Sequence, residues 1–469
     1  VSWVWILGLM QLFGIQFNIV NIILATFIFG QGDDYTIFIT EGLIHEYTYG
    51  KKILRAYRNS VALSALIMFI GIGTLIVAHH PAMRSLAEVV IVGMFTVVLM
   101  AYYLPPILFR WVTREHGKLR QVPLTMQRFV YSMEAFLFFL VCSIPYQIFA
   151  FVYSHLGRYT EEKKLFFHRT LCAVSRFCIN HVPGTQYSMS NPHDEKLEKP
   201  AIIICNHQSQ LDLMAVLSIA PKVAILTKKW VWNNPFYGLI IRAAEFYPAS
   251  DGIEKCTERL GNLIGRGYSV VVFPEGTRSK DCQIHRFHQG AFHLAKAYNV
   301  DILPVFLHGL GHVLPKGELS LRKGHMHMEI GKRISTADTI WSLPVRNQTK
   351  FFHSVYIEHY KELCRKLEKT EAILPYVAYQ YKYKGLEVER KANKQFRSIS
   401  RLAKQIDEWS GGNEMSIENC GQGELAFVFA LVHPDVRVIA MDADENKIAI
   451  ARNININAPN LSFMVKAEI

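Results

Sequence analysis

Long apolar runs alternate with short basic loops over the first quarter of the chain. The runs cover Val1–Leu12, Phe17–Thr40, Val61–Ala78 and Leu86–Trp111. The last three are long enough to cross a hydrocarbon layer of about 30 Å as helices rising about 1.5 Å per residue. Residues 1–128 are therefore predicted to be transmembrane helices. Because the first run begins within apolar sequence, we expect the natural start of the chain to lie upstream.

The charge of the connecting loops predicts an orientation. Two loops are basic and the link between them carries a single arginine; the basic residues are Lys51, Lys52, Arg55, Arg58, Arg110, Arg114, Lys118 and Arg120. Basic loops remain on the cytoplasmic side of a membrane. We therefore expect a protein of the bacterial cytoplasmic membrane with these loops in the cytosol.

A further apolar stretch, Phe129–Tyr153, has Pro145 in its middle and basic residues beyond both ends. A simple span would move the following domain to the opposite side of the membrane. The sequence favours a helix–break–helix hairpin over residues 129–164 that dips into one leaflet, since each half is too short to cross. One kinked span is the alternative.

Short apolar runs then alternate with longer helical patterns. The predicted strands are Ala201–Cys205, Val223–Thr227, Ser269–Phe273 and Asp301–Phe306, and the predicted helices are Leu211–Ile219, Glu254–Arg266, Gln289–Tyr298 and Phe351–Lys369. This alternation predicts an α/β domain over residues 165–370. A polar, basic linker is expected at 371–414, and a partial Rossmann-like α/β segment at 415–469. The fold class is thus multidomain, with transmembrane helices first.

Composition narrows the classes of partner. The formal net charge is +12 and half of the 469 residues are hydrophobic. Positive charge suits anionic headgroups or phosphorylated substrates, whereas the apolar runs and the lack of a nucleic-acid motif argue against nucleic acid. The eight cysteines include no C-x-x-C pair, which indicates reduced thiols rather than a disulfide framework or zinc site.

The most informative pair is His207 and Asp212. His207 directly follows the strand Ala201–Cys205, and Asp212 lies at the turn into the next helix. An imidazole can remove a proton from an attacking hydroxyl near neutral pH, and a carboxylate on its other nitrogen fixes the tautomer. No serine or cysteine nucleophile is then needed. By itself this spacing also fits a helix-capping aspartate beside a surface histidine.

A second loop, Phe273–Ser279, follows the predicted strand Ser269–Phe273. Its residues suit a phosphate-bearing ligand: Gly276 allows close backbone approach, Thr277 offers a hydroxyl, and Arg278 offers a planar fork for phosphate oxygens. Glu275 is expected to accept from a glycerol hydroxyl or to hold Arg278. The alternative is an ordinary turn with a surface arginine.

Together these motifs resemble the lysophosphatidate (1-acylglycerol-3-phosphate) acyltransferase family over roughly Leu165–Leu367. Lys228-Lys229, Pro235, Gly238 and Leu303-Pro304-Val305 add to the resemblance. It implies His207 as general base with Asp212 as its partner, and acceptor and phosphate contacts from Glu275, Gly276, Thr277 and Arg278. It also implies acyl-CoA or acyl carrier protein as donor, a lysophospholipid-like acceptor, a membrane-dipping hairpin and no required cofactor.

Two positions depart from that family. An arginine usual after its third strand is absent from Glu245–Ser250, and a usual lysine is replaced at His288-Gln289. Both changes remove positive charge, so the acceptor stays open and a non-phosphorylated lipid or pigment is an alternative. His285, His288 and His293 invite a metal site, but they overlap the family's ordinary helix start, and we expect no metal.

The flanking regions resemble two further families. Gly30–Tyr35 contains the intramembrane pair Asp33 and Asp34, and this region with the following spans resembles the C-terminal helices of MMPL-type lipid exporters of the resistance-nodulation-division superfamily. There the aspartate belongs to a proton relay; alternatively, the pair lies at the membrane edge. A lipid exporter with a passenger acyltransferase is therefore a second hypothesis.

The C-terminal segment resembles the start of an S-adenosylmethionine-dependent methyltransferase. Gly421 and Gly423 form a glycine turn before a helix, and Asp442 ends the next strand. A weak glycine motif on half a fold does not support methyl transfer, so we expect no bound S-adenosylmethionine.

Overall fold

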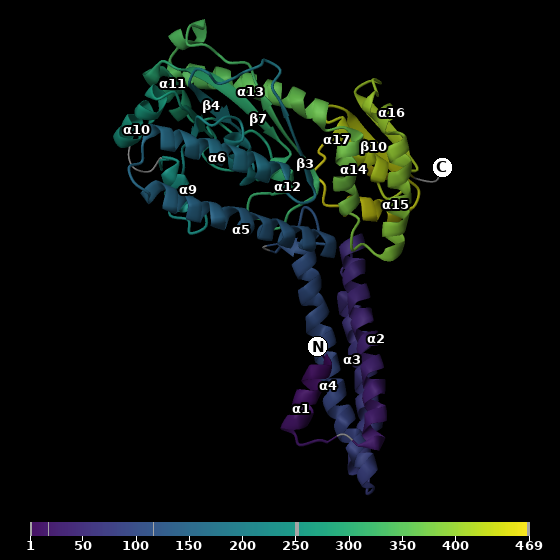
Figure 1. Cartoon of the computed structure of the whole chain (residues 1–469). Coiled ribbons are helices and arrows are strands. Elements are labelled where there is room, and N and C mark those ends of the chain that lie inside the picture. Colours follow the sequence, from purple (N-terminus) through teal and green to yellow (C-terminus); the bar gives the residue numbers. More distant parts are fainter. Residues whose placement is uncertain (1, 17, 116, 249–252, 467–469) are drawn as a thin grey trace. The chain divides into compact units, whose positions relative to one another are not determined.

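The computed structural model describes residues 2–16, 18–115, 117–248 and 253–466 (Figure 1). Several residues used above lie outside these ranges: Val1, Phe17, Ala249, Ser250 and the last three of the C-terminal segment. The chain divides into two compact units. Residues 126–367 form one, here the central unit, and residues 1–125 together with 368–469 form the other, here the split unit.

The first part of the split unit is helical, as its apolar runs predict. Its elements are α1 (Ser2–Leu12), α2 (Ile19–Tyr49), α3 (Leu54–Gly73), the 3-10 helix η1 (Thr74–Val77), α4 (Pro81–Thr113) and the short strands β1 (Arg114–Glu115) and β2 (Lys118–Leu119). Helices α2 and α4 approach closely, since a Cβ on Gly93 would lie 2.9 Å from Ile28. Helices α2, α4, α5 (Met126–His155) and the run from α3 through η1 are long and apolar enough to cross a membrane, by length and composition.

Helix α2 continues well past its acidic pair, Asp33 and Asp34. The Asn18 side chain caps its beginning, and the helix runs on beyond Thr40 to Tyr49. Asp33 and Asp34 therefore lie well inside the helix, and both are exposed in this unit. Whether the pair lies within the membrane or at its edge stays a prediction.

The helix break expected at Pro145 is wrong. Helix α5 is continuous with Pro145 inside it, and α6 (Glu161–Asn180) follows a short turn. A proline removes one helical hydrogen bond. Next to it, Tyr146 and Phe149 stack on Phe167 of α6 with ring centroids 5.6 and 6.1 Å apart, so packing holds the helix together through the proline position.

The central unit is built on a six-stranded mixed sheet in the order β3-β8-β7-β4-β6-β5. The strands are β3 (Thr185–Ser190), β4 (Ala201–Cys205), β5 (Val223–Ile225), β6 (Ser269–Val272), β7 (Asp301–His308) and β8 (Gly324–Ile330). Only β7 and β8 pair antiparallel among the described strands of this sheet. All four predicted strands are present, and β4 is buried along its whole length. Because β4 and β6 pair in parallel, their carboxyl ends meet at one edge.

Helices surround this sheet. They are α5 and α6, then α7 (Leu211–Leu217), α8 (Lys229–Trp232), α9 (Gly238–Ala243), α10 (Ile253–Gly265), α11 (Gly290–Tyr298), α12 (Leu310–Val313), the 3-10 helix η3 (Thr339–Ser342) and α13 (Val345–Leu367). Helix α10 packs against β6, α11 against β4, and α13 against β7 (Figure 1). The α/β prediction therefore holds for this unit.

The prediction of a polar linker at residues 371–414, in the second part of the split unit, is wrong. Residues 371–414 are mostly helical, in α14 (Thr370–Tyr379), α15 (Leu386–Arg401) and α16 (Ala403–Asp407). Helix α15 is charged, but Val388, Ala392, Phe396 and Ile399 share one buried face, so it forms core rather than a solvated connector.

These helices share a core with a parallel sheet of order β11-β10-β9. Its elements are β9 (Glu414–Glu418), α17 (Glu424–Val432), β10 (Arg437–Asp442), α18 (Glu445–Arg452) and β11 (Leu461–Val465). The α/β pattern that begins near residue 415 is thus one half of a larger folded region.

Candidate active site

His207 and Asp212 are in direct contact at the carboxyl end of β4. His207 lies in the loop after the strand, and Asp212 lies in the first turn of α7. His207 Nδ1 and Asp212 Oδ2 are 2.8 Å apart. The same oxygen accepts from the backbone N–H groups of Gln208 and Ser209, at 2.7 and 2.8 Å. The fully buried carboxylate therefore holds both the histidine ring and its loop.

One face of the His207 ring is also fixed. The ring stacks on Phe273 with centroids 4.1 Å apart and planes 24° apart. Because the carboxylate accepts from Nδ1, the neutral ring carries its lone pair on Nε2. Nε2 has no hydrogen-bond partner among the described residues, and the side chain is 19% exposed. The geometry thus presents one basic nitrogen to a ligand.

Asn206 anchors the strand end that carries His207. Its side chain donates to the Leu307 carbonyl and accepts from the Leu307 N–H, both at 2.8 Å. The Tyr356 hydroxyl donates to the same amide oxygen, and the Asn206 N–H bonds to that hydroxyl, both at 2.9 Å. The sequence motifs assigned no role to Asn206. A polar residue directly after five apolar ones was the available signal.

Glu275 contacts the backbone of two loops. Only 5% of it is exposed. One carboxylate oxygen accepts from the His207 N–H and the other from the His285 N–H, each at 3.0 Å. Burial raises its pKa although these bonds favour the charged form. Among the described residues no ion pair joins it to Arg278. Glu275 therefore acts as a positioning residue between two loops, and both oxygens are engaged by the protein.

The rest of the second motif lies at the same edge of the sheet as His207. The Ser279 N–H donates to the His207 carbonyl at 2.7 Å. Gly276 has a φ of 69°, and a Cβ there would lie 3.3 Å from the His288 ring, so the turn requires glycine. Thr277 is exposed and Arg278 is partly exposed. Because Glu275 is buried, Thr277 and Arg278 are the side chains of this motif that a ligand can reach.

The three histidines considered for a metal are not brought together. His285 pairs with Asp281 at 3.2 Å, and the His288 ring lies beside Gly276. Within the described ranges, His285, His288 and His293 form no group with metal-ligand spacing.

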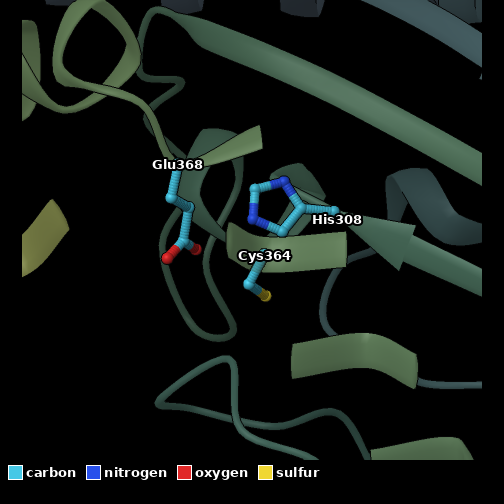
Figure 2. A group of neighbouring side chains, drawn as sticks. All are labelled: His308, Cys364 and Glu368. Carbon is cyan, nitrogen blue, oxygen red and sulfur yellow. The ribbon is translucent and has the colours of Figure 1, made fainter. Parts of the chain in front are cut away.

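Figure 2 shows another histidine of the central unit, His308 at the carboxyl end of β7, beside Cys364 of α13. Their ligand-type atoms lie within 4.8 Å of one another. Glu368, also labelled there, belongs to the split unit. Zinc sites draw three or four ligands from the protein, so His308 and Cys364 alone do not define a metal site.

The glycine turn near the C-terminus lies at the end of the parallel sheet of the split unit. Gly421 and Gly423 have φ values of 62° and 90°. The two oxygens of Asp442 accept from the N–H groups of Gly421 and Asp444, both at 2.9 Å, and the Tyr381 hydroxyl donates to the Gln422 carbonyl at 2.9 Å. The turn and the acidic residue meet as the pattern predicts, and the protein itself engages both oxygens.

Two family models match the chain in different places. Residues 186–308, which hold β4, β6, β7 and both motifs of the site, match the model described as Acyltransferase. This part of the chain is similar to acyltransferases. Residues 1–130 match the MMPL family. The two resemblances inferred from the motifs are therefore confirmed, whereas the methyltransferase-like resemblance stays a prediction.

Individual relatives agree with the first match. The chain is 33% identical over 150 residues to a chloroplastic 1-acyl-sn-glycerol-3-phosphate acyltransferase of Arabidopsis thaliana, covering 30% of this chain and 42% of that protein. It is 27% identical over 209 residues to a 1-acyl-sn-glycerol-3-phosphate acyltransferase of Saccharomyces cerevisiae, covering 43% of this chain and 68% of that one. The chain thus spans less than half of the Arabidopsis relative.

Among solved structures, the chain is similar to the 1-acyl-sn-glycerophosphate acyltransferase of Thermotoga maritima. The identity is 20% and the TM-score is 0.44, with 51% of this chain and 97% of that chain covered.

Proposed function

We propose that the chain is a membrane-bound O-acyltransferase that moves an acyl group from acyl-CoA or acyl carrier protein to a hydroxyl of a lysophosphatidate-like acceptor. The observation that carries this proposal is the 2.8 Å contact between His207 and the buried Asp212, beside a loop with a reachable arginine. The acyltransferase match over the same residues supports the reaction class.

The chemistry follows from the orientation of the ring. His207 Nε2 takes the proton from the acceptor hydroxyl as its oxygen attacks the thioester carbonyl. Asp212 stabilises the imidazolium that forms. The tetrahedral intermediate collapses, the thiolate of the donor leaves, and it takes the proton back from Nε2. The products are an ester and a free thiol, and no covalent enzyme intermediate is needed.

The test is transfer by the purified full chain in lipid vesicles. Wild type and His207→Ala receive lysophosphatidate with acyl-CoA or acyl carrier protein, and mass spectrometry measures the diacyl product. We expect transfer by the wild type and a loss of at least about 10³-fold in the variant, since the base is removed. His193→Ala is the matched control, because His193 is an exposed histidine outside the site. Equal rates for wild type and His207→Ala would refute the mechanism.

The proposal includes a location. We place the chain in the bacterial cytoplasmic membrane with the acyltransferase domain facing the cytosol, where acyl-CoA and acyl carrier protein are found. The four apolar helices and the basic loops between them support this placement. Protease protection of tags after residue 115 and after residue 466, in right-side-out and inverted vesicles, tests the orientation.

A second candidate function is lipid export, with the acyltransferase as a passenger that supplies the exported lipid. The MMPL match and the position of Asp33 and Asp34 inside α2 favour it. If it is correct, Asp33→Asn with Asp34→Asn stops export while acyl transfer in detergent is unchanged. Export of the lipid that continues in this double variant would argue against an exporter of this type.

A further inference from the structure

Four cationic side chains gather at the exposed part of the Phe273–Ser279 loop. Arg278 lies in this loop, Lys280 directly follows it, Lys228 lies between β5 and α8, and Lys316, which feels the charge of the other three, lies between α12 and β8. Within the described ranges none of the four forms an ion pair with a carboxylate. Like charges gathered without a partner destabilise one another. A group of this kind next to a candidate active site is what an anionic ligand would stabilise.

Lys316 is the member of this group that no motif predicts. Its ammonium group donates to the Thr277 hydroxyl at 2.9 Å and to the Arg278 carbonyl at 2.7 Å. Both acceptors are neutral, so the positive charge is not compensated. An ammonium group has three N–H donors, and the third has no partner among the described residues. Partial burial and then the neighbouring Lys280, Arg278 and Lys228 lower the pKa of Lys316.

This cationic group lies close to the candidate base along the backbone. Lys316 contacts Thr277 and Arg278, and the next residue, Ser279, donates its N–H to the His207 carbonyl. An anion held by Lys316 and Arg278 would therefore stand beside the loop of His207. An acceptor whose hydroxyl is a few bonds from a phosphate can place its phosphate at the cationic group and its hydroxyl at His207 at the same time.

Two cationic residues that are usual in the lysophosphatidate acyltransferase family are absent from this sequence, at Glu245–Ser250 and at His288-Gln289. Near the first of these positions, Glu245 forms ion pairs with Lys164 at 2.9 Å and Arg266 at 2.8 Å, so this region serves the interior of the fold. Ala249 and Ser250 lie outside the described residues. Lys316 brings a positive charge to the loop from a different segment of the chain.

We propose that Lys316 is a phosphate-binding residue of the acceptor site and makes that site selective for a phosphate monoester over a phosphodiester. A monoester carries close to two negative charges at neutral pH, because its second pKa is about 6, whereas a diester carries one. A site with several uncompensated cations gains more from the dianion. This inference rests on the proposed function and names the acceptor class.

The kinetic test uses the full chain in vesicles with three acceptors: 1-acylglycerol-3-phosphate, lysophosphatidylglycerol and monoacylglycerol. For Lys316→Met we expect the KM for the monoester to rise about 10- to 100-fold, the scale of a lost charge-assisted hydrogen bond, with kcat within about threefold. The KM values for the diester and the neutral acceptor should change less than about threefold. Lys316→Arg should recover most of the loss, and Lys332→Met, at an exposed lysine after β8, should behave as wild type.

A binding measurement separates this inference from the proposed function. Binding of 1-acylglycerol-3-phosphate to vesicles is compared for His207→Ala and for His207→Ala with Lys316→Met, so no turnover is required. A Kd about 10-fold or more higher in the second protein supports the role of Lys316, whether or not the wild type transfers acyl groups. Absence of acyl transfer by the wild type would contradict only the proposed function. Acyl transfer with unchanged KM and Kd, or with an equal rise for all three acceptors, would overturn the role of Lys316.

Discussion

Replacing Asp212 by asparagine is the sharpest perturbation of the proposed base. The substitution keeps the size of the side chain and removes its charge. Asp212 Oδ2 accepts from His207 Nδ1, from the Gln208 N–H and from the Ser209 N–H. An amide oxygen in the same position can keep these three contacts as weaker, uncharged bonds.

The expected magnitude has a catalytic and a structural part. With charge centres about 4 Å apart and an effective dielectric constant of about 20, the carboxylate stabilises an imidazolium by about 4 kcal/mol, or about 10³-fold in kcat. The other oxygen, Oδ1, is buried without a hydrogen-bond partner among the described residues. An NH2 group placed there, together with the weaker backbone bonds, should lower the free energy of unfolding by about 3 kcal/mol.

The two parts are measured separately. Thermal unfolding in detergent gives the loss of stability, and kcat for lysophosphatidate with saturating acyl-CoA is then measured well below the melting temperature. Glu362→Gln is the control, because it removes an exposed carboxylate on α13 that pairs with Lys366. A folded Asp212→Asn protein with kcat within about tenfold of wild type would refute the role of the carboxylate as partner of the base.

Three further perturbations test other parts of the structure. Glu275→Gln places a donor NH2 against one of two backbone N–H groups, so kcat should fall about 10- to 100-fold; an unchanged kcat would contradict its positioning role. Asn206→Ala removes three buried hydrogen bonds and should lower the free energy of unfolding by about 2–4 kcal/mol, read from thermal or denaturant unfolding, whereas a loss below about 1 kcal/mol would contradict the anchor. Burial lowers the pKa of Lys384 to about 7, so the unfolded chain binds more protons between about pH 7 and 10. Melting of the split unit should therefore rise with pH over that range, and Lys384→Met should flatten the rise.

Sequence patterns predicted the parts of the fold that carry strong apolar periodicity. The four predicted strands are continuous apolar runs, and β4 lies in the middle of the sheet. Strands β3 and β8 were missed because their residues alternate with polar ones that bond across the pair, as Ser188 does with His327 at 2.7 Å. The buried residues Met326, Met328 and Ile330 of β8 stand at alternate positions, so this strand lacks the continuous apolar run of the predicted ones.

Two predictions of local structure were wrong for different reasons. Pro145 predicts a break, but ring stacking on α6 keeps α5 continuous. The charged stretch 371–414 predicts a linker, but one face of α15 is apolar and buried. At Pro145 the deciding contacts come from α6, which a local pattern does not contain. In α15 the apolar residues recur at helical spacing, so the sequence did contain the signal, and the high charge of the stretch outweighed it in the prediction.

Some residues of the candidate site could be predicted from the sequence, and others could not. His207, Asp212 and the loop with Arg278 follow from motifs directly after strands, and the structure brings them to one edge of the sheet. The positioning role of Glu275 and the contact of Lys316 with Thr277 depend on how separate loops meet. Lys316 follows Arg278 by 38 positions, a separation that no short motif spans.

The central claim is that His207 of this chain drives acyl transfer to a membrane lipid. Its most direct test is mass spectrometry of the lipids of bacterial membranes that contain either the wild-type chain or His207→Ala at equal amounts. We expect the diacyl phosphate lipid to rise and its monoacyl precursor to fall only with the wild type. The same lipid change with both proteins would contradict the central claim.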